Sequence, residues 1–547
     1  MIREKKGEHM NKRIELLDCT LRDGAYIVES RFGTPAIKGI IKKMQDANVD
    51  IIECGWLKNN DHEEGSTFYH IPKDLEQYLY HKSNRSTYVV MIDWDRYDLE
   101  YLPPRDGKSI DAIRVVFPYE KFREGIAIGI KIREKGYKVY YQAANTLAYS
   151  EEDLVELAHM INEVHPESLS VVDTFGAMYQ DDLDRIVTVL DKELNPDIKL
   201  GFHSHNNQQL SFSLSIHFVE MLTKSSRGMI IDASLCGMGR GAGNTTTELI
   251  ANYLNNKCYC NYDMNVIMDA IDMYMEYFQE NYSWGYSTSY FIAGMYCCHV
   301  NNIAYLTQNH RTNAHDMRNI IQSLSPAARK KYDYDLLEKK YNENQNRIVN
   351  DENVLAELKQ VIGEREVLLL APGKTIDIEK DKIKAYIEKN NPRVIGVNAL
   401  NPVYEYDYLF VINSARYQYA REIYTQQFNR TKKILLSNIK TEPEQDEIII
   451  NFNRVVKFGW EHFDNAVINC LRLMDRLQVS HIAIAGFDGF KHKYNESYAD
   501  ASLPTLNPDG KWDELNEEIA DMFEDFCRTT STTMEIRFIT ESIFNKK

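Results

Sequence analysis

The sequence has no long apolar run. No segment of its 547 residues approaches the ~20 uninterrupted apolar residues that a membrane-spanning helix needs. The first 20 residues are charged and lead directly into an apolar strand, without the apolar segment and small-residue cleavage site of a secretory leader. We therefore expect a cytoplasmic protein with no membrane partner.

Positive charge and paired cysteines are also scarce. Lys and Arg number 64 against 81 Asp and Glu, which leaves a formal net charge of −17. Nucleic-acid binding needs clustered Lys and Arg, so this balance argues against a nucleic-acid partner and favours a small-molecule substrate. The nine cysteines are scattered, and Cys258 with Cys260 or Cys297 with Cys298 stand too close for the usual zinc pairs. They indicate reduced thiols rather than a disulfide framework.

What the sequence does have is a regular alternation of short β-rich runs and longer amphipathic segments over residues 13–243. This pattern is typical of parallel strands joined by crossover helices. Eight β/α units in ~230 residues match the size of a (β/α)8 TIM barrel, an α/β fold. The predicted strands are RIELLDCT, DIIECGW, TYVVMID, AIRVVFP, KVYYQAAN, SLSVVDTF, KLGFHSH and MIIDASLCG.

Polar residues gather where these predicted strands end. In a TIM barrel the active site lies at the carboxyl ends of the strands, where they run into loops. Polar side chains at these places indicate a functional site rather than a core. They are Arg22, Asp23, Glu53, Asp93, Gln142, Asn145, Asp173, His203 and His205.

The two histidines of GFHSHNNQQ are candidate metal ligands. His203 and His205 stand two positions apart, so on a strand both rings leave the same face, at the mouth of the barrel. Asp23, at the end of the first strand, would add a carboxylate. Two His and one carboxylate suit several divalent ions and leave positions open for a substrate. The alternative is two separate histidines that share no ion.

Four ordered motifs carry a resemblance to a known superfamily: DCTLRDGAY (18–26), VVDTFGAM (171–178), GFHSHNN (201–207) and GMGRGAGNTTTE (237–248). The chain, over residues 13–310, resembles the metal-dependent TIM-barrel aldolases and lyases. These include 4-hydroxy-2-oxovalerate aldolase, 3-hydroxy-3-methylglutaryl-CoA lyase, and the isopropylmalate and citramalate synthases. The resemblance implies that Asp23, His203 and His205 bind a divalent metal ion, and that Asn244 is a fourth ligand or contacts one. Mn²⁺ and Mg²⁺ are favoured, with Co²⁺ and Zn²⁺ as alternatives.

The hydroxy-oxovalerate aldolases are the branch that the sequence most resembles. The segment from Trp284 to Tyr305 is similar to their helical region, and Tyr296 matches a tyrosine that reaches their active site. Arg22 matches an arginine that stabilises the charge of an enolate in this family, a task suited to a planar, permanently charged side chain. The resemblance implies an enzyme that joins or cleaves a 2-oxo acid, such as pyruvate, and an aldehyde. The metal would act as a Lewis acid for the enolate.

One position departs from that branch. Where those aldolases carry a histidine as the general base, this sequence has Tyr26. An unperturbed tyrosine, with a pKa of ~10, is a poor base near neutrality. The alternatives for the base are Tyr26 with a lowered pKa, a metal-bound water, and His299 or another group.

Two other functions stay open. The Gly-Arg-Gly-Ala-Gly-Asn run resembles the condensing synthases, which use acetyl-CoA in a Claisen reaction. A non-catalytic metal-binding scaffold would also explain the missing histidine. Cys236 lies near the loop where CoA-thioester lyases carry a catalytic cysteine, but its spacing to Asn244 departs from theirs, so we interpret it as a buried strand-end thiol.

Two further parts follow the predicted barrel domain (13–250). Residues 251–360 are rich in helix formers and aromatic residues and end in a charged, Asn-rich linker. A second alternation over residues 365–547 predicts an open α/β sheet. Its APGKTI turn (371–376) lacks the full Walker pattern.

The last part faintly resembles the Rossmann-like domains of bacterial surface-glycan enzymes. That resemblance implies a nucleotide or nucleotide-sugar ligand, and a role of the whole protein in surface-glycan or sugar-acid biosynthesis. The alternative is a domain that only mediates assembly or docking. We expect a homo-oligomer.

Overall fold

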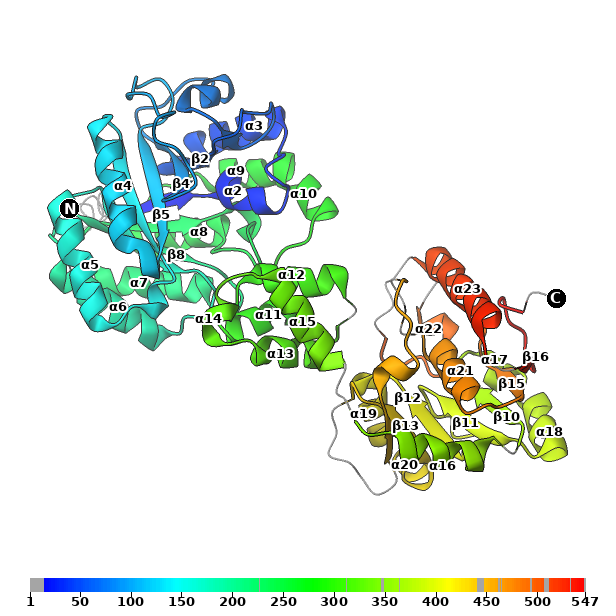
Figure 1. The fold of residues 1–547 in the computed structure, drawn as a ribbon. Coiled ribbons are helices and arrows are strands. Elements are labelled where there is room, and N and C mark those ends of the chain that lie inside the picture. The colour runs from blue at the N-terminus through cyan, green and yellow to red at the C-terminus, as the bar shows by residue number, and fades with distance from the viewer. Residues whose placement is uncertain are drawn as a thin grey trace. The chain divides into compact units, whose positions relative to one another are not determined.

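The computed structural model of the chain describes residues 14–545 apart from short internal gaps. The gaps are 226, 311, 346–348, 364, 440–446, 461–462, 464, 492–493, 506–510 and 532. The chain divides into two compact units (Figure 1). The first comprises the residues up to Ile303 with Pro326–Lys331, and the second comprises Ala304–Ser325 and the residues from Tyr332 onward. The three-part domain limits drawn from the sequence stay a prediction.

Eight parallel strands of the first unit close into a barrel, as predicted. Their order is β1-β9-β8-β7-β6-β5-β4-β2, and β1 also pairs with β2, which closes the ring. A two-residue strand, β3 (Phe68–Tyr69), adds to β2. Each predicted run contains one barrel strand: β1 (Ile14–Asp18), β2 (Ile51–Leu57), β4 (Thr87–Asp93), β5 (Ala112–Pro118), β6 (Lys138–Ala144), β7 (Ser168–Asp173), β8 (Lys199–Ser204) and β9 (Met229–Ala233).

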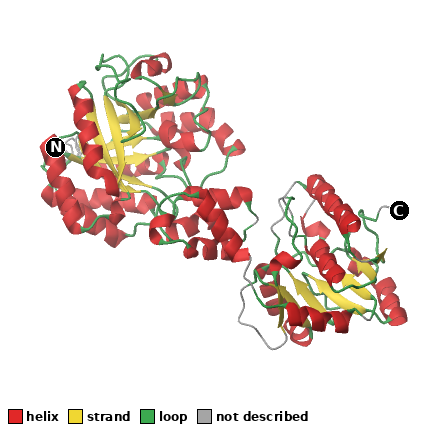
Figure 2. Cartoon of the chain, in the orientation of Figure 1, coloured by secondary structure: helices red, strands yellow, loops and turns green. Residues whose placement is uncertain are grey.

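Amphipathic helices cover the outside of the barrel strands (Figure 2). In α6, for example, Leu183, Ile186, Val187 and Leu190 are buried at helical spacing. The covering helices are α3 (Thr34–Asp46), α4 (Phe122–Glu134), α5 (Glu151–Val164), α6 (Gln180–Glu193), α7 (Ser211–Leu222) and α8 (Thr247–Cys258).

Two of the eight β/α units depart from the regular pattern. After β2 the chain forms β3 and the 3-10 segment η2 (Pro72–Tyr78) instead of an α-helix. Between β4 and β5 the described residues form turns and no α-helix. Pro103, Pro104 and Gly107 lie in that connection, and such residues interrupt helical hydrogen bonding.

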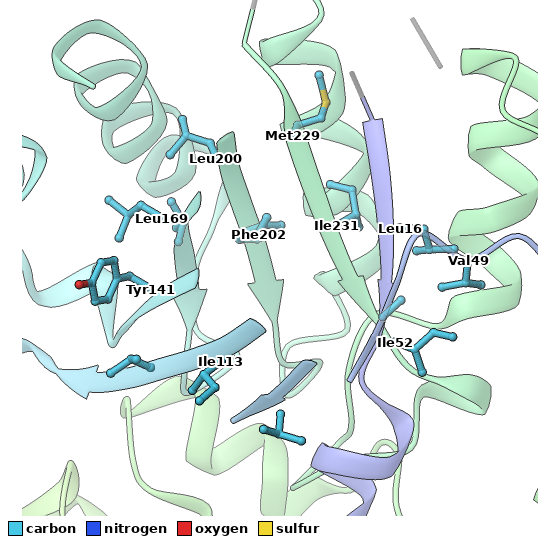
Figure 3. Close-up of a cluster of buried hydrophobic side chains, with 14 of the residues drawn as sticks. Leu16, Val49, Ile52, Ile113, Tyr141, Leu169, Leu200, Phe202, Met229 and Ile231 are labelled. Atoms are coloured by element: carbon cyan, nitrogen blue, oxygen red, sulfur yellow. The ribbon is translucent and has the colours of Figure 1, made fainter. Parts of the chain in front are cut away.

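The barrel wall separates two sets of alternating side chains. Leu16, Ile52, Ile113 and Ile231 belong to the large cluster that strands and helices share (Figure 3). Residues next to these in the chain belong to a separate buried cluster inside the barrel, which consists of Leu17, Cys19, Ile51, Val89, Ala112, Tyr140 and Ile230. Two positions further along three of these strands, the same alternation turns three charged residues inward: Glu53, Arg114 and Asp232. The barrel interior therefore changes from apolar to charged toward the carboxyl ends of the strands.

Further helices follow α8. The first unit continues with α9 (Met264–Ala270), the π-helical turn η6 (Ile271–Met275), α10 (Glu276–Asn281), α11 (Thr288–Met295) and α14 (Pro326–Arg329). Helix α12 (Val300–Asn309) spans the division between the units. Helices α13 (Ala314–Ser323) and α15 (Tyr334–Gln345) belong to the second unit. Within the described parts of the chain, no helix has the length and apolar character needed to cross a membrane.

The second unit contains a seven-stranded parallel sheet of order β14-β13-β12-β11-β10-β15-β16. The chain starts in the middle at β10, moves outward to β14, and returns on the other side of β10 with β15. This order creates a topological switch point between β10 and β15. The second alternation predicted over residues 365–547 contains these strands: β10 (Val367–Leu370), β11 (Arg393–Val397), β12 (Tyr408–Val411), β13 (Lys432–Leu436), β14 (Glu447–Ile450), β15 (His481–Ala485) and β16 (Glu535–Phe538).

Helices cover both faces of this sheet. Helices α18 (Lys380–Asn390), α19 (Ser414–Ile423) and α20 (Thr425–Arg430) share one buried cluster with Leu368 and Leu370. Helices α16 (Glu352–Ile362), α21 (Ala466–Arg476) and α23 (Trp512–Thr529) share another with Val367 and Leu369. Since successive residues of β10 enter different clusters, both faces are buried, which explains its continuous apolar sequence. Short helices α17 (Thr375–Ile378) and α22 (Tyr494–Ser497) complete the unit.

Candidate active site

The first strand ends in a tight helical turn that carries Arg22 and Asp23. Helix α2 (Thr20–Asp23) follows β1 closely, and the 3-10 turn η1 (Gly24–Tyr26) continues it. The carboxylate of Asp18 holds the turn by accepting the main-chain N–H of Thr20 at 3.1 Å and its hydroxyl at 3.0 Å. The turn therefore fixes the predicted arginine and aspartate at the mouth of the barrel, where both are buried.

His203 and His205 turn the same ring nitrogen toward Asp23. The Nδ1 atom of His203 lies 3.0 Å from Asp232 Oδ2, and that of His205 lies 3.0 Å from the main-chain oxygen of Asp173. These acceptors favour a proton on each Nδ1, so that each Nε2 keeps its lone pair. The Nε2 atoms lie 3.5 Å and 3.7 Å from Asp23 Oδ2. The structure thus brings together the three predicted metal ligands.

Asn244, from the loop after β9, joins this group. Its Nδ2 donates to Asp23 Oδ2 at 2.6 Å and to the main-chain oxygen of Met238 at 3.3 Å. Its Oδ1 is buried and has no hydrogen-bond partner within the described part of the chain. Leaving a buried acceptor unpaired costs ~1–3 kcal/mol. A cation would satisfy this oxygen.

The donor set fits a divalent cation. Neutral imidazole nitrogens, a carboxylate and an amide oxygen are common ligands of such ions. Two atoms bound to one ion at ~2.1 Å each lie ~3–3.6 Å apart, close to the spacing between the imidazoles and Asp23. A direct N–H···O bond would be shorter, at ~2.7–3.2 Å. Cys19 is a further donor, since one ligand atom each from Cys19, Asp23 and His203 lie within 4.8 Å of one another.

Six buried side chains form a closed ring of ionic contacts, which we call the charge ring. In order, they are Arg22, Asp23, His203, Asp232, Arg114 and Glu53, each at most 5% exposed. Arg22 donates to Asp23 Oδ1 at 2.7 Å and to Glu53 Oε2 at 2.8 Å. Arg114 donates to Glu53 Oε2 at 2.8 Å and pairs with Asp232 through its other terminal nitrogen. The ring couples the metal-ligand candidates to the strands that carry them.

Burial and charge set the protonation states of these ligands. Burial opposes ionisation of Asp23, but Arg22 and the two histidines hold its pKa well below the usual range. Burial lowers the pKa of His205 to about 4, although Asp23 opposes this shift. At neutral pH the carboxylate is therefore charged and the His205 imidazole is neutral, as metal binding requires.

Tyr26 lies beside the cationic side chain of Arg240. The guanidinium of Arg240 sits 3.7 Å from the centre of the Tyr26 ring, which also packs edge-on against Trp56 at 6.0 Å. Tyr26 is 40% exposed, so water limits the rise in its pKa that partial desolvation produces, and Arg240 opposes that rise. The hydroxyl therefore stays protonated near neutrality, and can donate a proton or a hydrogen bond there.

Helix α11 brings Tyr296 close to the loops of the barrel mouth. A Cβ atom at Gly294 would lie 2.9 Å from Gln208 Nε2 and 3.1 Å from the main-chain oxygen of Gly176, so the helix approaches these loops closely at this glycine. Tyr296 caps the same helix, is half-buried, and lies 5.0 Å from the guanidinium of Arg329.

His299 follows α11 and also faces charged groups of the mouth. Its Nε2 lies 3.5 Å from Arg240 Nη1. Burial lowers the pKa of His299 to about 3, and Arg240 and His205 add to this shift. The imidazole is therefore neutral over the physiological range.

Other predicted strand-end residues have structural partners. Asp93 pairs with Lys58 at 3.4 Å, and Gln142 donates to Ser170 Oγ at 2.9 Å. The carboxylate of Asp173 accepts main-chain N–H groups of the following turn at 2.9 Å and 3.3 Å. These contacts position strand ends around the site.

Several residues of the site were missed from the sequence. Arg114 and Asp232 lie within the apolar runs AIRVVFP and MIIDASLCG, and a charge inside such a run is the signal that could have found them. Cys19 lies next to the turn, and nothing in the sequence distinguishes it from the other scattered cysteines. Cys236 is half-buried, and burial raises its pKa to about 12, which leaves it an unreactive thiol near neutrality.

Comparison with known proteins agrees with this barrel. Residues 121–273 match the family model described as HMGL-like. The chain is 26% identical over 271 residues to a 4-hydroxy-2-oxovalerate aldolase of Geobacillus genomosp. 3, covering 47% of this chain and 76% of the relative. It is 24% identical over 263 residues to an oxaloacetate decarboxylase of Mycobacterium tuberculosis, covering 47% and 74%.

A solved structure is also similar. The N-terminal domain of a predicted aldolase from Bacteroides vulgatus is 24% identical, with 54% of this chain and 97% of that chain covered and a TM-score of 0.45. The closed ring of parallel strands is a TIM barrel, and the sequence matches show that it is similar to the HMGL-like family and to 4-hydroxy-2-oxovalerate aldolases. The resemblance stated from the four motifs is confirmed to that extent.

Proposed function

We propose that the barrel makes or breaks a carbon–carbon bond next to the carbonyl of a 2-oxo acid, with an aldehyde as the second substrate. One observation carries the proposal: His203 and His205 present their Nε2 atoms to Asp23 beside Arg22, at the mouth of a TIM barrel. The names of the two relatives, an aldolase and a decarboxylase, describe reactions that cleave bonds of this kind.

Asp23, His203, His205 and the amide oxygen of Asn244 would hold a divalent cation, with Mn²⁺ or Mg²⁺ as the first candidates. When bound, the ion would supply a Lewis acid for the keto and carboxylate oxygens of the 2-oxo acid. The tied Nδ1 atoms keep both imidazoles oriented without a substrate.

Arg22 is placed to stabilise the enolate. Its Nε and Nη1 atoms are engaged by Glu53 and Asp23, while Nη2 has no hydrogen-bond partner among the described side chains and main-chain atoms. A donor that is already fixed can meet the charge that develops on an enolate oxygen without reorganisation. Burial opposes its charge, but Asp23 and Glu53 raise the pKa of Arg22, so the side chain stays cationic.

Tyr26 is proposed as the proton donor to the aldehyde oxygen in the bond-forming direction. A tyrosine hydroxyl, with an ordinary pKa of ~10, keeps its proton at neutral pH, and Tyr26 lies beside the site with its side chain 40% exposed. The neutral ring of His299, beside Arg240, is the second group proposed for proton transfer.

Solvent deuterium exchange tests this function. Metal-free protein is incubated with pyruvate in D₂O, with and without Mn²⁺, and the methyl signal is followed by NMR. We expect exchange only with the metal ion, and its loss in His203→Ala. The control is His159→Ala, which removes an exposed histidine of α5.

Two further measurements, thiol release from acetyl-CoA and Mn²⁺ binding, separate the alternative functions. Release of free thiol from acetyl-CoA would favour a condensing synthase. Mn²⁺ binding that disappears in His203→Ala, with no exchange for any 2-oxo acid, would favour a metal-binding scaffold.

A further inference from the structure

The second unit has a pocket at the switch point of its sheet. The segments that follow β10 and β15 line it, together with the N-terminal ends of α19 and α21. It holds about 850 Å³ of empty space, part of it open to solvent. In open parallel sheets, ligands bind outside the carboxyl ends of the strands at such a point.

Arg416 is the buried cation of this pocket. The residue is 5% exposed, and its Nη1 atom has no hydrogen-bond partner among the described residues. Its guanidinium lies over the ring of Tyr498, at 4.9 Å. The nearby carboxylate of Asp500 is engaged by the hydroxyls of Tyr419 and Tyr424, at 2.7 Å and 2.6 Å. A buried guanidinium with an unpaired N–H is costly, so this side chain indicates an anionic ligand.

Two helices begin at the same pocket. Asn413 caps α19 by accepting the main-chain N–H of Arg416 at 2.9 Å. Asn465 caps α21 by accepting the N–H groups of Val467 and Ile468, both at 3.1 Å. The N-terminus of a helix carries partial positive charge, so both helices add to the attraction for an anion.

The rest of the pocket lining provides a carboxylate and two aromatic rings, which suit the uncharged parts of a ligand. Asp488 follows β15 and accepts the main-chain N–H of Thr375 at 2.8 Å as well as its hydroxyl. A Cβ atom at Gly373 would lie 2.5 Å from this carboxylate, so glycine is required there. A carboxylate recognises hydroxyl donors. Phe490 and Tyr498 line the pocket and pack edge to face at 5.8 Å, and Phe490 also stacks on Trp512 at 5.8 Å. They give the pocket an aromatic lining, which suits a planar ring.

We propose that this pocket binds a nucleoside phosphate. The phosphate would lie against Arg416 and the N-terminal ends of α19 and α21, the sugar hydroxyls against Asp488, and the base against Phe490 and Tyr498. All these residues belong to the second unit. The proposal therefore stands or falls independently of the activity proposed for the barrel.

Calorimetry of the full chain tests the proposal. The probes are ADP, GDP, CDP and UDP, with inorganic phosphate and the free nucleosides in separate titrations. We expect at least one diphosphate to bind, and phosphate or nucleoside alone to bind ~10-fold more weakly or worse. Arg416→Gln should weaken binding ~10-fold to 100-fold, the loss expected for a charge-assisted hydrogen bond. Arg430→Gln, which removes an exposed arginine of α20, should leave binding unchanged.

Three results would overturn the proposal: no binding of any nucleotide, equal binding by Arg416→Gln, or inorganic phosphate binding as tightly as the nucleotides. The last result would mean a simple anion site. If Arg416→Gln fails to fold, Arg416→Lys and saturation-transfer NMR on the wild-type protein take its place. Magnetisation transfer from the aromatic residues to the base protons is then expected, and its absence contradicts the assignment.

Discussion

The two parallel sheets of this protein bury charge in opposite ways. In the barrel, the charge ring contains three carboxylates and two guanidinium groups, so the carboxylates are in excess by one. At the switch point of the second sheet, Arg416 is buried with a free N–H and no described ion pair. A buried charge costs several kcal/mol unless it is paired. The sign of each imbalance matches the ligand that we propose for it: a cation in the barrel and an anion in the second sheet.

The largest expected effect is loss of the cation site in His203→Ala. We expect Mn²⁺ affinity to fall at least ~100-fold, since even a partner that only orients a ligand contributes 10-fold to 100-fold, and pyruvate exchange to become undetectable. Titration calorimetry and exchange NMR measure the two effects, with His159→Ala as the control. Metal-dependent exchange that survives in His203→Ala would place the ion elsewhere.

The second prediction breaks the charge ring at Arg114. Arg114→Met leaves Glu53 and Asp232 buried without their shared cation, and breaking a buried pair costs ~3–5 kcal/mol. The free energy of unfolding, measured in urea, should fall by that amount. Adding Glu53→Gln and Asp232→Asn to Arg114→Met should recover most of it, because the uncompensated charges are then gone. An unchanged stability in Arg114→Met would show that water reaches these carboxylates.

The fold was more predictable than the charge ring, for a physical reason. Apolar runs mark strands locally, and each run predicted for the barrel coincides with a strand to within a few residues. The expectation of eight regular β/α units is wrong in two places: no regular α-helix follows β2, and none lies between β4 and β5, where Pro103, Pro104 and Gly107 oppose helix formation. The His-x-His spacing predicted that His203 and His205 lie on the same face of one strand, because the alternation of side chains along a strand is also a local property.

Pairings at long range could not be predicted in the same way. Arg114 meets Asp232, a residue 118 positions away, only through the closure of the barrel. Arg416 and Arg421 look alike in the helical segment SARYQYAREI, yet the first is buried and the second exposed. The sequence of this segment alone does not show which of the two arginines lines a pocket.

A third prediction concerns the shape of the cation beside the metal site. In the wild-type protein, Arg22 contacts Glu53 through Nε and Asp23 through Nη1, and its Nη2 remains available to a substrate. Arg22→Lys keeps the positive charge but cannot make these contacts at the same time, because lysine lacks the planar guanidinium group. We expect kcat for pyruvate exchange to fall ~10-fold to 100-fold, as for loss of a fixed oxyanion donor, with Mn²⁺ affinity nearly unchanged. Equal losses of metal affinity and exchange would instead mean that Arg22 acts by holding Asp23.

Tyr26→Phe should have a smaller effect and leave the pH profile in place. Partial desolvation raises the pKa of Tyr26 above its ordinary ~10, so the hydroxyl stays protonated from pH ~6 to ~9 and its titration contributes no inflection there. The rate of aldol formation should fall ~10-fold, at the low end for loss of a proton donor, with every inflection retained. Disappearance of an inflection in the variant would show that Tyr26 titrates within this range and serves as a base.

The smallest expected effect tests the comparison most directly. An Arg→Met substitution should lower the free energy of unfolding at Arg114 but leave it unchanged or raise it at Arg416. Arg416→Met removes a buried charge that has no ion pair among the described residues, and the nearby Asp500 keeps its hydrogen bonds from Tyr419 and Tyr424. Replacing buried charged groups with apolar side chains is often neutral or stabilises by ~1 kcal/mol or more. In ligand-free protein the variant should therefore unfold at equal or higher urea concentration, and hydrogen exchange of the β10 and β15 amides should slow or stay unchanged. A saturating nucleotide should reverse the order, since only the wild-type protein gains from binding. Destabilisation of ligand-free Arg416→Met by several kcal/mol, as expected for Arg114→Met, would mean that Arg416 is paired within the protein and that the contrast between the two sheets does not hold.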